Sequence, residues 1–259
     1  MFAADPELAS FFDVDVIEGE HKPSYNEAPS QMIRSVQTDR AETSERVLDL
    51  KQWGLVPFWA KENFKPLINA RAETVTEKPS FRSAVKKRRC LIPTNGYYEW
   101  QKEPDGRKQP FFLSLADAQG NPAPPGREPV LAMAGIYEGP SRDAKEKFRE
   151  THGEDAKIDL ASTAALLTRS APDTLGEIHP RMPLFVPRDL WEVWLDPELG
   201  DSEQLQRLID AIKTPPLVPR AVGSAVGNVR NNFPGLLTPL NLGSEAALKA
   251  ADEGALPGL

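Results

Sequence analysis

The sequence predicts an α+β domain in which many short strands, antiparallel or mixed in their pairing, form the core and a few helices lie at the periphery. Proline accounts for 25 of the 259 residues, about twice its usual share, which argues against a helical bundle or coiled coil. Short segments with alternating or continuous apolar residues recur along the chain, and we find no internal repeat. The length suits one large domain or two small ones, and the lack of a clear boundary favours one.

The first expected elements are a helix and a strand. Pro6, directly after Asp5, suits the first turn of a helix that continues to Phe12. The segment 47–55 alternates apolar and polar residues, as a half-buried strand does. The alternation changes parity near Gln52, which predicts a bulge or a break between two short strands.

The middle of the chain predicts further short elements. A short helix is expected within 78–88. Strands at 90–92 and 97–100 are joined through a segment that contains Asn95-Gly96, a strong turn signal. We also expect strands at 111–115, 130–137 and 160–167 and a capped helix that begins at 201–205.

Two stretches are expected to be inserted, exposed loops. The segment 119–129 holds four prolines and two glycines, and the segment 139–157 is charged and almost free of apolar residues. The residues after 240 are rich in alanine and glycine. We therefore expect one domain over 1–240 and a C-terminal tail over 241–259.

Composition excludes several classes of protein. The net charge of −7 argues against a generally basic nucleic-acid coat protein, although a local basic site stays open. The single cysteine, Cys90, allows no intramolecular disulfide and suits a reducing cytoplasm. We see no signal peptide at the start and no apolar run close to 18 residues, so we expect no membrane span. Three scattered histidines without ligand spacing predict no metal site, and we expect no cofactor.

Two residues are candidates for acid–base chemistry. Glu99 lies in an aromatic run, and on a strand its neighbours Tyr98 and Trp100 would point to the opposite face. A covered face would raise the pKa of Glu99 toward neutrality and suit it to proton transfer; the alternative is a solvent-facing carboxylate. His179 stands beside Pro180, where it suits either proton transfer or a structural hydrogen bond.

Another pair suits a polynucleotide. Asn69 and Arg71 would share one face of an extended segment, where an amide and a guanidinium can orient and hold a phosphate chain. The alternative is a hydrogen-bonded turn with an ion pair from Arg71 to Glu73 or Glu77.

A dense basic cluster and three tryptophans also suggest a nucleic-acid contact. Together with Trp53, Trp59 and Trp100, the cluster could combine phosphate contacts with base stacking; a solvated helix face is the alternative. The cluster consists of Lys78, Arg82, Lys86, Lys87, Arg88 and Arg89. Cys90 follows two of these arginines, which could activate its thiol, but the apolar strand after it favours a buried, inert thiol.

Nine segments, taken together and in order, resemble the SOS response-associated peptidase (SRAP) family, whose members process abasic sites in DNA. Each segment is weak evidence by itself, whereas nine in family order are specific. They cover about residues 1–240. The segments are Tyr25–Pro29, Trp53–Pro57, Ile68–Thr74, Lys78–Arg82, Arg89–Pro93, Gly96–Trp100, Lys108–Pro110, Ile178–Pro183 and Val222–Asn231.

The resemblance implies a barrel-like core and a covalent chemistry. Family members begin Met-Cys-Gly-Arg, and removal of the methionine exposes a cysteine with a free α-amine of pKa about 8. This amine attacks the aldehyde of an abasic site in single-stranded DNA, and the thiol then closes a thiazolidine. By resemblance, Asn69 orients the amine and the sugar. Glu99 acts as acid and base in methionine removal, ring closure and reversal, and His179 assists opening of the sugar.

The resemblance also implies a DNA-binding surface. Arg71 and Arg181 would hold phosphates. Trp59 and Trp100, together with the loop from Asn26 to Pro29, would shape the path of the strand or the pocket. The implied protein is a monomer of the bacterial cytoplasm that contacts the nucleoid when it is bound to DNA.

The sequence departs from the family at its start. Met1 is followed by Phe2 and not by Cys-Gly-Arg, so the sequence looks as if it begins several residues late. As written, the chain is not expected to form a thiazolidine, because Cys90 carries no free α-amine. A non-covalent single-stranded DNA-binding module is therefore the alternative function. A peptidase that acts on other proteins is a third reading, which rests mainly on the family name.

Overall fold

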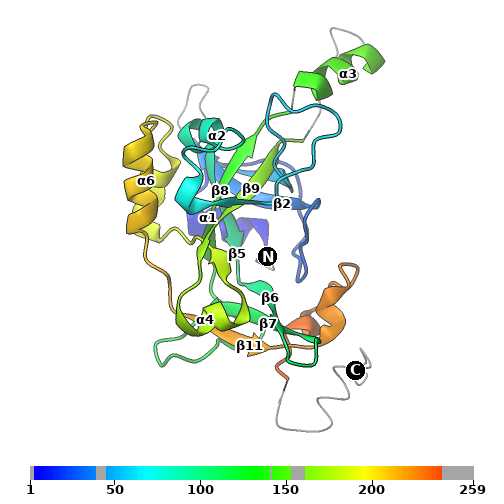
Figure 1. Cartoon of the computed structure of the whole chain (residues 1–259), viewed down its shortest axis with the longest axis vertical. Helices are drawn as coiled ribbons and strands as arrows, with labels where there is room; N and C mark the ends of the chain where they lie inside the picture. The colour runs from blue at the N-terminus through cyan, green and yellow to red at the C-terminus, as the bar shows by residue number, and fades with distance from the viewer. Residues whose placement is uncertain (1–2, 39–44, 141, 153–160, 241–259) are drawn as a thin grey trace.

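The computed structural model describes residues 3–38, 45–140, 142–152 and 161–240. It combines two sheets with short peripheral helices, which confirms the α+β class (Figure 1). In Figure 1 the larger sheet occupies the upper half, and the smaller sheet of β6, β7 and β11 lies below it. The tail expected over 241–259 lies outside the described residues.

The larger sheet contains a closed ring of strands. Its members are β2 (Met32–Thr38), β3 (Arg46–Trp53), β5 (Arg89–Thr94), β8 (Leu131–Glu138) and β9 (Thr163–Ser170). Successive neighbours pair antiparallel. The ring closes where β3 pairs parallel with β9, at Gln52 with Thr163 and Trp53 with Ala164. Mixed pairing and a ring-shaped core thus agree with the expected fold.

Three short strands extend this sheet. They are β1 (Val16–Ile17), which pairs parallel with β3, β4 (Asn69–Arg71), which pairs parallel with β9, and β10 (Arg181–Pro183), which pairs antiparallel with β9. The strands β4 and β10, which hold candidate residues and are distant in sequence, therefore both lie beside β9. The parity change expected near Gln52 coincides with the end of β3 at Trp53.

The second sheet consists of β6 (Tyr97–Lys102), β7 (Lys108–Leu115) and β11 (Leu217–Ala221), all antiparallel. Although β5 and β6 follow each other in sequence, Asn95-Gly96 passes the chain from one sheet to the other and does not form a hairpin between them. A Cβ on Gly96 would lie 2.5 Å from the carbonyl oxygen of Leu113, so only glycine fits at this crossing.

Six α-helices lie around the sheets in the described part of the chain. They are α1 (Asp5–Phe12), α2 (Arg82–Lys87), α3 (Arg142–His152), α4 (Asp173–Ile178), α5 (Trp191–Leu195) and α6 (Ser202–Ala211). The helix expected after Asp201 is confirmed, with the Asp201 carboxylate accepting from the backbone N–H of Gln204 at 2.9 Å. None of the described helices is long and apolar enough to cross a membrane.

The expectation of two exposed loops needs correction. The segment expected as a loop at 139–157 contains α3, because its alanine, lysine, glutamate and arginine residues favour a helix without apolar burial. Residues 153–157 lie outside the described residues. Within 119–129, Glu128 is buried and pairs with Arg220 of β11 at 2.6 Å, so the end of this segment belongs to the core.

Apolar side chains pack on both sides of the ring. On the helix side, Phe12 of α1 stacks on Trp191 with ring centroids 4.6 Å apart. On the other side a second cluster, which includes Ile33, Met133 and Met182, lies between the ring and the smaller sheet. This second cluster forms the floor of the candidate site.

Candidate active site between the two sheets

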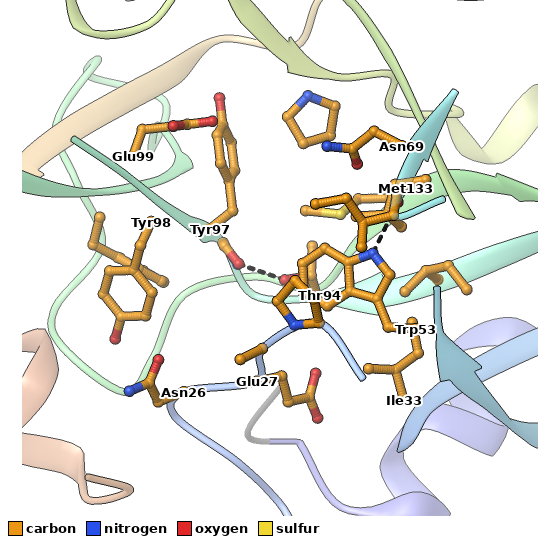
Figure 2. A pocket seen from close by; sticks show the side chains of 18 of the residues that line it. Asn26, Glu27, Ile33, Trp53, Asn69, Thr94, Tyr97, Tyr98, Glu99 and Met133 are labelled. Atoms are coloured by element: carbon orange, nitrogen blue, oxygen red, sulfur yellow. Dashed lines mark hydrogen bonds between the residues drawn. The ribbon is translucent and has the colours of Figure 1, made fainter. Parts of the chain in front are cut away.

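A cavity of about 650 Å³ lies between the ring and the smaller sheet. Strands β4, β5, β6 and β10 line it, together with the loops 24–29 and 226–229. Figure 2 shows Glu99 and Tyr97 on one side and Asn69 on the other, with the amide end of Asn69 directed toward the Tyr97 side. The cavity thus joins residues from distant parts of the sequence.

Glu99 and His179 meet inside this cavity. The distance from Oε1 of Glu99 to Nδ1 of His179 is 3.6 Å, and the two side chains are 24% and 43% exposed. Burial raises the pKa of Glu99, while the His179 ring and the backbone N–H of Trp100 act in the opposite direction. Of the two interpretations of Glu99, the structure supports the covered, pKa-shifted carboxyl.

The backbone of Arg181 orients the His179 ring. Nδ1 of His179 lies 2.8 Å from the carbonyl oxygen of Arg181 and 3.2 Å from its backbone nitrogen. With a proton on Nδ1 the ring donates to this carbonyl oxygen, and with a lone pair there it accepts from the Arg181 N–H, so each tautomer has a backbone partner.

Asn69 and Arg71 alternate with Ala70 along β4 and are both exposed, as expected for two residues on one face of a strand. Ala70 between them is buried. Both line the cavity. The alternative of an ion pair from Arg71 to Glu73 is wrong, because Glu73 pairs with Arg181.

Arg181 is held by several groups. Its Nη1 donates to Oε1 of Glu73 at 2.6 Å and its Nη2 donates to Oε2 at 2.9 Å. Nη2 also donates to the carbonyl and hydroxyl oxygens of Thr168 on β9. The pKa of Glu73 is lowered, chiefly by its hydrogen bonds from Arg181. Sequence reasoning connected Glu73 to the wrong arginine because β9 brings Arg181 beside it.

The loop from Asn26 to Pro29 forms one wall of the cavity. Asn26 is buried, and its Nδ2 donates to the carbonyl oxygens of Val226, Asn228 and Asn231 at 3.0–3.1 Å. Its amide therefore joins two loops of the cavity wall. This observation favours a positioning role for Asn26 over a direct DNA contact.

The three tryptophans differ in position. Trp53 and Trp100 line the cavity, and Trp53 donates from Nε1 to the carbonyl oxygen of Ile68 at 2.9 Å. Trp59 does not line the cavity; it is 47% exposed and packs edge-on against Phe64. The resemblance therefore placed Trp59 near the site, whereas the structure places it outside the cavity wall.

The dense basic cluster lies apart from the cavity. None of its six residues lines the cavity. Arg89 is buried and donates to backbone carbonyls such as that of Trp194, and Arg88 pairs with Glu138 at 2.6 Å. Two of its arginines therefore stabilise the fold, and the cluster does not contribute to the cavity wall.

Cys90 has the environment of an inert thiol. It is fully buried within the ring, and burial raises its pKa to about 12. The neighbouring arginines do not activate it; Lys51 lowers its pKa slightly against the larger effect of burial. The structure thus supports the inert alternative.

Sequence reasoning gave no individual role to Tyr97 or Glu27, which both line the cavity. Tyr97 lies on the same side as Glu99, and burial raises its pKa strongly. Glu27 also lines the cavity, with its Oε1 atom 3.4 Å from Nε2 of His21. Alternation along β6 was the available signal for Tyr97. Among the described residues, no three His, Cys, Asp or Glu side chains group closely enough to hold a metal ion.

Fold and site together define an α+β protein whose cavity between two sheets holds a carboxyl–imidazole pair. The family model described as SOS response associated peptidase (SRAP) matches residues 1–229, and the chain belongs to this family.

Relatives and solved structures agree with this assignment. The abasic site processing protein YoqW of Bacillus subtilis is 32% identical over 242 residues, which cover 92% of this chain and 96% of that protein. The abasic site processing protein HMCES of Gallus gallus is 31% identical over 257 residues, which cover 90% and 71%. A crystal structure of a protein from Bacteroides thetaiotaomicron has a TM-score of 0.59 at 23% identity, covering 91% of this chain and 94% of that one. This structural likeness shows the fold.

Proposed function

We propose that this protein processes abasic sites in single-stranded DNA, and that a form with the family's N-terminal cysteine links covalently to them. One observation carries the proposal. Glu99, 3.6 Å from His179, lies across the cavity from Asn69, in a chain whose relatives are named abasic site processing proteins.

The pocket suits the proton transfers of this chemistry. The α-amine adds to the sugar aldehyde, water leaves to give a Schiff base, and the thiol adds to the imine carbon to close the thiazolidine. A Glu99 carboxyl of raised pKa can donate the proton that water needs to leave, and its carboxylate can take the thiol proton. The imidazole of His179 can accept the hydroxyl proton when the sugar ring opens. Methionine removal consumes one water and needs the same acid and base.

The cavity rim suits a strand of DNA. Arg71 is exposed and has no ion-pair partner among the described residues, so its guanidinium can hold a backbone phosphate. Trp100, 38% exposed at the rim, offers a ring on which a base can stack. We propose that DNA contact is confined to this region of an otherwise acidic chain.

The test uses a version restored to begin Met-Cys-Gly-Arg. We expect a heat-stable adduct with uracil-containing single-stranded DNA that has been treated with uracil-DNA glycosylase. A version that begins Met-Ser-Gly-Arg is the matched control and gives none. No adduct from the cysteine version, or an undiminished yield from both Glu99→Gln and Asn69→Ala in that version, overturns the proposal.

The second candidate function is non-covalent binding of single-stranded DNA. Two exposed residues of the cavity lining favour it, because Arg71 and Trp100 can contact a phosphate and a base without a covalent bond. It predicts salt-sensitive binding by the chain as given and no adduct in any version. An in-frame Met-Cys-Gly-Arg upstream of Met1 in the gene contradicts this candidate, and a stop codon directly before Met1 favours it.

We further propose that the protein acts as a cytoplasmic monomer in the DNA-damage (SOS) response and joins the nucleoid when bound to DNA. Sedimentation of the purified chain tests the monomer. Transcript levels after DNA damage test the link to that response.

A further inference from the structure

The bidentate contact between Glu73 and Arg181 has the geometry of a phosphate contact. Two guanidinium nitrogens of Arg181 donate to the two carboxylate oxygens of Glu73, at 2.6 and 2.9 Å. Two oxygens of a backbone phosphate accept from arginine in the same fork-like arrangement. The Glu73 carboxylate therefore occupies the position on Arg181 that a phosphate would take.

The surroundings allow this carboxylate to leave. The Glu73 side chain is 47% exposed, whereas Arg181 is 22% exposed and is also held by Thr168. Glu73 also accepts weaker backbone hydrogen bonds, from the N–H of Ser170 at 3.3 Å and from its own N–H. Arg181 would thus stay in place if Glu73 rotated into solvent.

Arg71 differs from Arg181 in its ion pairing. It stands two residues before Glu73, is exposed and lines the same cavity. It has no ion-pair partner in the part of the chain that the structure describes. The cavity therefore has one arginine open to DNA and one covered by a carboxylate.

We propose that Glu73 stands in for a DNA phosphate on Arg181 and is displaced when single-stranded DNA binds. This inference rests on the proposed function and adds a residue that sets affinity and salt dependence. When a phosphate replaces Glu73, the freed carboxylate recruits a cation, so Arg181 contributes almost no net release of counterions. Without the carboxylate charge, the same contact releases the cation that had condensed on the phosphate.

The test measures binding of single-stranded DNA that carries a tetrahydrofuran abasic analogue. This analogue has no aldehyde, so the readout is independent of covalent chemistry. We compare wild type, Glu73→Gln and Glu77→Gln by fluorescence anisotropy between about 50 and 300 mM salt, where counterion release is measurable. Glu77 is exposed and nearby in sequence, so Glu77→Gln removes the same charge without touching Arg181.

We expect Glu73→Gln to bind about tenfold more tightly at the lowest salt, since it frees a guanidinium for a charge-assisted contact. The slope of log affinity against log salt should steepen by about 0.7, the value for one added phosphate contact on a single strand. In an Arg181→Gln background, Glu73→Gln should change neither quantity.

Equal behaviour of Glu73→Gln and Glu77→Gln, or weaker binding by Glu73→Gln, overturns the inference. If Glu73→Gln does not fold, Glu73→Asp takes its place in the test, because aspartate keeps the charge but has a shorter side chain. For that variant, a gain in affinity without a steeper slope of log affinity against log salt counts against displacement. If wild type does not bind the analogue DNA, the proposed function fails; if it binds and only the Glu73 effect is missing, this inference alone fails.

Discussion

Nδ1 of His179 lies 3.6 Å from Oε1 of Glu99, although one residue follows α4 and the other belongs to β6 of the smaller sheet. A further hydrogen bond, from Nε2 of Gln101 to the carbonyl oxygen of Glu177 at 3.3 Å, joins the same two elements. The pair therefore depends on how β6 docks against α4. Burial raises the pKa of its carboxyl above the usual value.

Glu99→Gln should slow adduct formation in the version that begins Met-Cys-Gly-Arg. Loss of a general acid and base lowers a rate by about 10²–10⁴-fold, and glutamine keeps the shape of the side chain. The rate is measured by gel electrophoresis after heating, with Glu103→Gln on the same hairpin as the control. A rate within about twofold of the control contradicts the role of Glu99.

The same substitution should change how stability depends on pH. Burial raises the pKa of Glu99 above 4.5, so the folded chain holds this proton more tightly than the unfolded chain does. Its contribution to the free energy of unfolding is full below the unfolded value and is lost as pH rises through the folded value. Glu99→Gln avoids that loss and should gain stability over wild type as pH rises from about 4 to 8. Urea unfolding measures the difference; a difference that shrinks with pH contradicts it.

The buried pair of Glu128 and Arg220 should be essential to the fold. Their side chains are 0% and 4% exposed, so Glu128→Ala leaves a buried guanidinium without its charge partner. We expect a loss of about 3–5 kcal/mol in the free energy of unfolding by urea. The control is Asp105→Asn, which breaks an exposed pair with Arg107 and should have no measurable effect. Equal effects of the two substitutions would contradict the structural role.

Asn26→Ala should loosen the wall of the cavity. The substitution leaves the carbonyl oxygens of Val226, Asn228 and Asn231 without the amide that joins them, at a cost of about 1–3 kcal/mol. Hydrogen exchange should accelerate in residues 226–231, and binding of abasic-analogue DNA should weaken. Asn63→Ala, on an exposed loop, serves as the control. Unchanged hydrogen exchange in residues 226–231 would contradict the positioning role of Asn26.

Cys90 should resist alkylation in the folded protein. With a pKa of about 12, about one thiol in ten thousand is ionised at pH 8, and the side chain is fully buried. Mass spectrometry after iodoacetamide treatment should show modification only when denaturant is present. Modification of the folded chain at the rate of a free cysteine would contradict the buried environment.

Local sequence patterns predicted much of the fold. The helix after Asp5 and the helix after Asp201 are encoded by a proline in the first turn and by a capping carboxylate, so neighbouring residues suffice to predict them. Alternation likewise predicted β3, and the Asn95-Gly96 turn signal helped to predict β6. Alternation failed at Lys51, which is buried beside Asp49 and over the Tyr137 ring, because both faces of a ring strand are covered and polar groups can pair inside.

By itself the sequence determined the α+β class, most strands and the family resemblance, and it named Asn69, Glu99 and His179 as candidate site residues. Only the tertiary structure decided which charges meet. Arg181 pairs with Glu73 because both lie against β9, Asn26 joins two loops, and Trp59 lies outside the cavity. The physical reason is that alternation and capping act between neighbours, whereas ion pairs and cavity walls depend on distant segments that only the closed ring brings together.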